Sequence, residues 1–145
     1  MQFLLLFLLS LEARAMEAHV LRLKPGQDPK IELLKFVQDK KLEAASISTA
    51  VGSLKKTVLR YSDQKVATEI TGPREVLSLT GTLGASSGAH LHLSISDEKG
   101  QVLGGHLLDG SVVYTTLEVV LLSFPKLKFE RVHDPASGYK ELIIK

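Results

Sequence analysis

The chain of 145 residues contains no cysteine and no tryptophan, and aromatic residues make up only 6% of it. Without cysteine it can form no disulfide, no thiolate metal site and no cysteine nucleophile. With so few aromatic residues, its core must consist mainly of leucine, valine and isoleucine side chains. The remaining composition, 44% hydrophobic and 23% charged, is that of a globular protein with enough residues for one domain.

The chain also lacks a large net charge of either sign. The formal net charge is +2, a smaller surplus than a dedicated nucleic-acid domain usually presents. From Arg22 to Lys65 there are ten Lys or Arg against five Asp or Glu, which we interpret as a solvated helix face plus turns. The sequence has neither the phosphate-binding pattern GxxxxGK[ST] nor the nucleophile pattern GxSxG. We therefore expect nucleic-acid binding to be weak at most, and common nucleotide-hydrolysing and serine-hydrolase sites are excluded.

The N-terminal residues 1–15 form an apolar extension that we separate from the domain at 16–145. Its apolar run, 3–11, is too short to span a bilayer, so no membrane span is expected. The sequence Ala13-Arg14-Ala15 fits a signal-peptide cleavage site, although the run is not preceded by Lys or Arg. Met16 offers an alternative start. A start at Met16 predicts a cytoplasmic or nuclear protein, and a working signal peptide predicts a secreted one.

One helix is expected, at 29–41. Asp28 is a suitable N-cap residue and Pro29 suits the first helical position. Apolar residues then recur at helical spacing on one side. The rest of the chain reads as short strands, at 18–23, 45–51, 57–61, 66–71, 75–82, 90–96, 101–107, 116–124, 128–132 and 139–144. The run 116–124 is apolar enough for a strand buried on both faces. This pattern predicts an α+β fold, a single domain with a largely antiparallel, barrel-like sheet and one main helix.

Three of the five histidines lie close together in the sequence, at His90, His92 and His106. Alternate residues of a strand share a face, so His90 and His92 project together, roughly 6.6 Å apart along the strand. The intervening turn, Asp97-Glu98-Lys99-Gly100, is typical of a type I turn closed by a glycine with positive φ. That turn pairs Asp97 with Gln101 and places His106 opposite His92. A loop one residue shorter or longer would send His106 to the other face.

Three imidazoles on one face can bind a divalent metal and leave a coordination position open. Gly104 and Gly105 carry no side chain that could block this face. The alternative is that the histidines are half-exposed strand residues that hydrogen-bond to neighbours. His19 and His133 have no comparable neighbours and read as ordinary surface residues. Asp109 and Glu118 are the acidic residues nearest in sequence, and nothing in the sequence places either of them at the site.

Five segments in this order resemble the PPC domain family, also called DUF296: ISTAVGSL (47–54), LR (59–60), GPREVLSLTG (72–81), HLHLS (90–94) and GQVLGGHL (100–107). The resemblance runs from Ala18 to Ile144. It implies a compact α+β domain assembled as a homotrimer. In the prokaryotic members it also implies a divalent metal, with zinc expected, whose ligands here would be His90, His92 and His106. Plant members carry AT-hooks and generally lack these histidines, whereas this chain has the histidines and no Arg-Gly-Arg-Pro segment.

Three functions are compatible with these features. The first is a trimeric binding or regulatory module that engages an unknown protein or small-molecule ligand and has a three-histidine metal site. The second is a metal-dependent enzyme acting on a small molecule, in which the ion activates a water molecule. The third is a DNA-associated regulator like the plant relatives. We place the binding module first and identify no catalytic residue.

Overall fold

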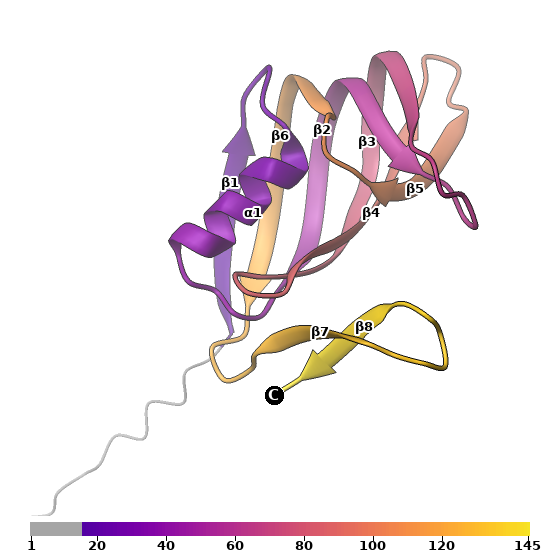
Figure 1. Cartoon of the computed structure of the whole chain (residues 1–145). Coiled ribbons are helices and arrows are strands. Elements are labelled where there is room, and N and C mark those ends of the chain that lie inside the picture. The colour runs from indigo at the N-terminus through magenta and orange to yellow at the C-terminus, as the bar shows by residue number, and fades with distance from the viewer. Residues whose placement is uncertain (1–15) are drawn as a thin grey trace, which may run out of the picture.

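The structure is a computed structural model that describes residues 16–145. The extension at 1–15 lies outside the described residues. The described chain contains eight strands and one helix (Figure 1). In chain order they are β1 (Glu17–Leu23), α1 (Pro29–Asp39), β2 (Ala45–Arg60), β3 (Thr68–Gly84), β4 (Gly88–Ser96), β5 (Val102–Leu107), β6 (Val112–Ser123), β7 (Phe129–His133) and β8 (Lys140–Ile144).

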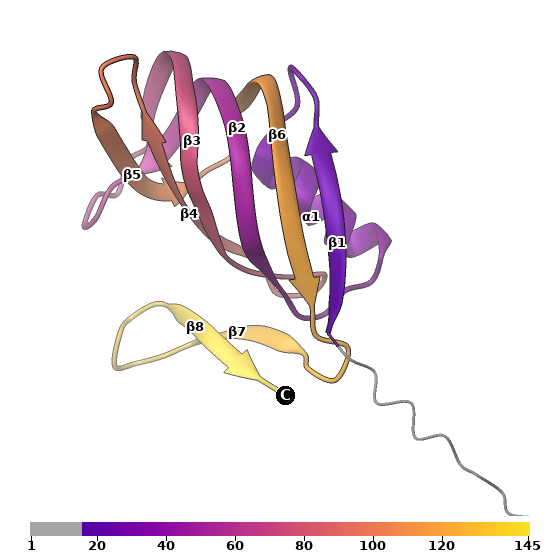
Figure 2. The same ribbon diagram turned by 180° about the vertical axis from the view of Figure 1, so that it is seen from behind.

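Six strands form one antiparallel sheet in the order β1-β6-β2-β3-β4-β5. An additional pairing between β2 and β5, with Leu59 opposite Leu107 and Arg60 opposite His106, closes β2, β3, β4 and β5 into a ring. Strands β7 and β8 form a separate two-stranded sheet that lies below the lower ends of the main strands in Figures 1 and 2. The predicted α+β class, with a largely antiparallel and partly closed sheet, is confirmed.

Helix α1 begins where the sequence predicts and ends earlier. Asp28 is the N-cap, and its Oδ1 accepts hydrogen bonds from the backbone N–H groups of Lys30 and Ile31. The helix ends at Asp39 rather than at the predicted residue 41, because Lys41 adopts a left-handed conformation with φ of 54°. Seen from opposite sides, Figures 1 and 2 place α1 across one face of the sheet. Leu33 and Val37 on α1 are fully buried there.

Two pairs of predicted strands are each one long strand. The segments 45–51 and 57–61 belong to β2, and 66–71 and 75–82 belong to β3. Gly52, Gly72 and Gly81 lie within these strands. A Cβ at Gly52 would lie 2.1 Å from the carbonyl oxygen of Thr116, so this glycine permits the close approach of β2 to β6. The register of β2 with β3 shifts between Leu54 and Lys56, opposite Gly72 and Pro73.

The core consists of leucine, valine, isoleucine and alanine side chains, as the composition predicts. In the single chain, the run 116–124 is buried on one face and not on both as expected. In β6, Leu117, Val119 and Leu121 are buried, whereas Glu118 is exposed and Val120 is half-buried. The sheet is covered by α1 on one face only, so the other face of β6 lies toward solvent in a single chain. Among residues 16–145, no helix is both long and apolar enough to cross a membrane.

Candidate metal centre

The three histidines come from two neighbouring strands of the closed ring. His90 and His92 lie two residues apart on β4, and His106 lies on β5. In the β4–β5 pairing, Ser94 is opposite Gly104 and His92 is opposite His106. The predicted register is therefore confirmed, and all three side chains lie on the same face.

The turn between β4 and β5 sets this register. The backbone N–H of Asp97 donates to the carbonyl of Gln101 at 3.1 Å, and that of Gly100 donates to the carbonyl of Asp97 at 3.0 Å. The Oδ1 of Asp97 also accepts from the N–H groups of Lys99 and Gln101. Gly100 has a φ of 76°, the positive value that the sequence predicts for this turn.

The ring nitrogens of the cluster lie within contact distance of one another. His92 Nε2 is 3.2 Å from His90 Nε2 and also 3.2 Å from His106 Nδ1. One nitrogen of each ring lies within 4.8 Å of the other two. His90 and His92 are exposed and His106 is half-buried, so the three nitrogens remain accessible from solvent.

These distances fit a metal ion better than they fit hydrogen bonds alone. A ring nitrogen carries either one hydrogen or one lone pair in the ring plane, so His92 Nε2 cannot form two well-aligned hydrogen bonds at once. Two imidazole nitrogens bound to the same tetrahedral zinc lie roughly 3.3 Å apart, given zinc–nitrogen distances of about 2.0 Å. A shared ion would satisfy all three nitrogens. The three residues could therefore hold a metal ion.

The surroundings keep two of the imidazoles neutral. Partial burial, followed by the charges of Arg131 and His92, lowers the pKa of His90 below its usual value, and Glu141 opposes this shift. Partial burial and then the charge of Arg60 lower the pKa of His106. A neutral imidazole is the form that binds a metal. Both shifts therefore favour the binding-competent protonation state near neutral pH.

Two grooves that share lining residues lie beside the cluster, and the sequence did not predict them. The larger has a volume of about 620 Å³ and the smaller of about 300 Å³. His90, Arg131 and Glu141 line both grooves. Arg131 and Glu141 belong to the β7–β8 hairpin, far from the histidines in sequence. Only a tertiary contact places them here: Arg131 Nη2 donates to Thr82 Oγ1 at 2.9 Å, and Thr82 is the cross-strand partner of His90.

The other acidic and histidine residues considered from the sequence lie outside the cluster. Asp109 forms an ion pair with Lys30 at 2.9 Å. Glu118 lies on β6 opposite Arg22 and Val51. His133 is exposed on β7.

His19 differs from the prediction of an ordinary surface residue. It is half-buried, its Nε2 lies 2.9 Å from Ser123 Oγ, and its ring packs edge-on against Phe36. This contact ties β1 to β6 and α1. His19 therefore has a structural role apart from the cluster.

The glycines before His106 also permit close approach between strands. A Cβ at Gly105 would lie 2.8 Å from the carbonyl oxygen of Arg60, and one at Gly104 would lie 3.0 Å from that of Leu93. These glycines therefore allow β5 to approach β2 and β4 closely. The resulting closure is what brings Arg60 directly opposite His106.

A partly closed antiparallel sheet with one helix and three converging histidines defines a small α+β domain with a candidate metal centre. The sequence profile of the Plants and Prokaryotes Conserved (PCC) domain matches residues 10–125. The chain belongs to this family, which is the one that the sequence resembles under the name PPC domain.

Solved structures and curated relatives agree with this assignment. A hypothetical protein from Salmonella cholerae-suis (Salmonella enterica) is 46% identical with a TM-score of 0.88, covering 90% of this chain and 94% of that one. A metal-containing protein from Archaeoglobus fulgidus is 30% identical with a TM-score of 0.76, covering 88% and 93% of the two chains. The bifunctional protein GlmU of a Synechococcus strain is 43% identical over 130 residues, which are 90% of this chain and 20% of GlmU. The chain thus spans about a fifth of the length of the curated relatives that it matches.

Proposed function

We propose that the chain is a binding or regulatory module that assembles as a homotrimer and holds one divalent metal ion, zinc, through His90, His92 and His106. The observation that carries this proposal is the convergence of the three ring nitrogens around His92 Nε2, with two contacts of 3.2 Å. The description of the Archaeoglobus relative as metal-containing supports it.

The donor set makes zinc the expected ion. The cluster offers only nitrogen, and imidazole suits zinc, copper, nickel and iron. Zinc is commonly held by three protein ligands with a fourth position left for water or a ligand, which it polarises as a Lewis acid. Here the three rings lie at the edge of two grooves, so a ligand in either groove could reach that position.

The trimer is supported by an apolar surface on the face of the sheet opposite α1. Val20 on β1 is 78% exposed and Val51 on β2 is 59% exposed. The half-buried Val120 of β6 lies between β1 and β2 and is the cross-strand partner of Val20. Val20 and Val120 are bordered on this face by the charged pair Arg22 and Glu118, and exposed apolar side chains with a polar rim are typical of a protein interface. Association of three copies through this face would cover it.

A metal-dependent enzyme acting on a small molecule is the second candidate. The observation that favours it is Glu141, a half-buried carboxylate that lines both grooves with His90. Ser137 donates a hydrogen bond to Glu141 Oε1 at 2.8 Å and fixes its position. A carboxylate beside a metal-bound water can serve as a general base. This candidate predicts that Glu141→Gln abolishes a turnover that depends on added metal, whereas a pure binding module shows no such turnover.

The metal site is tested by zinc titration of metal-free wild type, His92→Ala and His133→Ala. We expect one zinc per chain in wild type and in His133→Ala. Loss of a hydrogen-bonding neighbour of a metal ligand typically weakens binding by about 10- to 100-fold, so loss of the central ligand His92 should weaken it at least as much. Equal zinc uptake by all three proteins would show that the cluster is not a metal site.

A further inference from the structure

We propose that the groove beside the histidine cluster binds a small organic anion, with its carboxylate or phosphate group held between Arg60 and Arg131. This inference rests on the proposed function in one respect: the metal ion held by the three histidines would bind the anion in addition to the two arginines. The two arginines themselves are fixed by contacts that do not involve a metal.

Each arginine is anchored beside one histidine. Arg60 is the cross-strand partner of His106, and its Nη1 donates to the carbonyl of Gln64 at 3.3 Å. Arg131 reaches the other side of the cluster through its hydrogen bond to Thr82, which is opposite His90. Both side chains are half-buried and both line the larger groove. The cluster is therefore flanked by two guanidinium groups that come from different parts of the chain.

Neither guanidinium is neutralised by a carboxylate. Within residues 16–145, the ion pairs include neither Arg60 nor Arg131. The other basic and acidic residues that line the larger groove are Lys30, Lys65, Lys140, Asp63 and Glu141.

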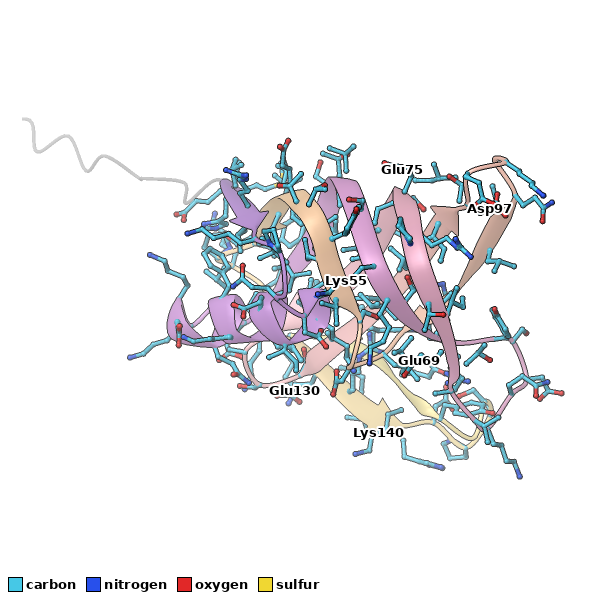
Figure 3. The ribbon with its side chains drawn as sticks, turned by 90° about the horizontal axis from the view of Figure 1, so that it is seen from above. Lys55, Glu69, Glu75, Asp97, Glu130 and Lys140 are labelled. Atoms are coloured by element: carbon cyan, nitrogen blue, oxygen red, sulfur yellow. The ribbon has the colours of Figure 1, made fainter. Side chains whose placement is uncertain are left out.

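Counting these charges leaves the groove positive. Lys30 is already paired with Asp109, so four basic side chains face two acidic ones. Asp97 does not offset this balance, since it lies at the tip of the β4–β5 hairpin, away from Lys140 on β8 (Figure 3). A partly buried guanidinium without a counter-charge favours an anionic partner.

The shape of the groove favours a small molecule. Its volume of about 620 Å³ is within the range of small-molecule sites. Ala89, Leu108 and Tyr139 add apolar surface to the wall, where the carbon skeleton of an organic anion could pack. The planar guanidinium group can pair with the oxygens of either a carboxylate or a phosphate. The proposal therefore specifies an organic anion that carries one of these two groups.

The β7–β8 hairpin forms one wall of the groove. The PCC profile ends at residue 125, and Arg131, Tyr139 and Glu141 all follow it. The ring of β2 to β5 thus supplies the histidines and Arg60, while the hairpin supplies the opposite wall.

The test is calorimetric titration of the full chain with inorganic phosphate and, separately, with succinate. The protein is loaded with zinc and freed of excess metal. Wild type, Arg60→Gln, Arg131→Gln and Arg74→Gln are compared. Arg74 serves as the control because it is also half-buried and donates to a backbone carbonyl, that of Pro73, but it does not line either groove and is paired with Glu98 at 4.0 Å. Zinc content is measured for every variant.

We expect saturable binding of at least one probe by wild type and by Arg74→Gln. Binding should be weakened by about 10- to 100-fold in each of the other two variants, the value of a hydrogen bond to a charged group. Unchanged zinc content would show that the arginines act on the anion. No binding of either probe by wild type, or equal binding by all variants, would overturn the inference and leave the metal site standing.

Two further results would distinguish failure of the metal site from failure of the anion site. If wild type takes up no zinc and still binds a probe through Arg60 and Arg131, the anion site stands and the metal site is wrong. If the two substitutions lower affinity only for a DNA duplex, assayed in parallel, the groove serves a nucleic acid and the inference is wrong.

Discussion

His92 and His106 are direct cross-strand partners in the β4–β5 hairpin, and His92 Nε2 lies 3.2 Å from His106 Nδ1. This relationship is set by the turn at 97–100 and not by contacts within the cluster. A slip of one residue in the pairing would move His106 to the other face of the sheet. Turn residues that touch no histidine therefore control the geometry of the candidate metal centre.

Gly100→Ala should weaken zinc binding as well as stability. Gly100 has a φ of 76°, and a Cβ at this position would meet no other atom within 4 Å, so the cost is backbone strain, about 1 to 3 kcal/mol. The matched control is Gly138→Ala in the β7–β8 hairpin, with a φ of 78° and equally open space. Urea unfolding should show a similar loss for both variants, while zinc affinity should fall severalfold only in Gly100→Ala. An equal zinc affinity in the two variants would contradict control by the turn.

The histidine cluster and the start of the helix could be predicted because both depend on local chemistry. Strand parity places His90 and His92 together, and one turn of known type adds His106. Asp28 followed by Pro29 marks the first turn of α1. In each case, residues within a short segment determine the local geometry, so the sequence pattern is sufficient to predict it.

The long strands, the closure of the ring and the groove could not be predicted because they depend on contacts between distant segments. Gly52 lies against Thr116 of β6, and Gly105 lies against Arg60 of β2, so the need for glycine at both positions comes from residues distant in the sequence. Arg131 and Glu141 carry no local signal at all. Their position follows from the docking of the β7–β8 hairpin, in which the backbone N–H of Phe129 donates to the carbonyl of Glu43.

Asp28→Ala should destabilise the domain by about 2 kcal/mol, at the upper end for loss of an N-cap. The value should be high because Asp28 Oδ2 also accepts from the N–H of Gly110 at 2.6 Å, which ties the helix start to the loop before β6. Asp39→Ala is the control. It removes only an exposed ion pair with Lys35 and should cost less than about 1 kcal/mol. Thermal and urea unfolding measure both, and equal losses would show that the cap and the Gly110 contact together contribute no more than an exposed ion pair.

Val20→Glu should shift the proposed trimer to the monomer. Val20 is 78% exposed in the single chain, so a charged side chain there leaves the core intact and acts only if another copy covers this face. Val66→Glu is the matched control, since Val66 is 69% exposed in the β2–β3 loop. Light scattering at micromolar concentration should report three chains per particle for wild type and Val66→Glu, and one for Val20→Glu. A monomeric wild type would show that the trimer proposal is wrong.

The metal-free domain should lose stability as the pH falls below about 6.5, the ordinary pKa of histidine. The pKa values of His90 and His106 are lowered in the folded state, chiefly by partial burial and by the charges of Arg131 and Arg60. Between the unfolded and folded pKa values the unfolded chain binds more protons, so the free energy of unfolding decreases with falling pH and levels off below the folded values.

Urea unfolding in the presence of a chelator, at several pH values from about 7.5 to about 5, measures this dependence on pH for wild type and two variants. The double variant His90→Gln/His106→Gln should show a smaller decrease over this range, because the two groups with lowered pKa values are gone. His133→Gln, which alters a histidine outside the cluster, should retain the wild-type profile. Zinc should steepen the loss for wild type, since protons and metal compete for the same nitrogens. A double variant with the wild-type profile would show that the two imidazoles are not the source of the pH dependence.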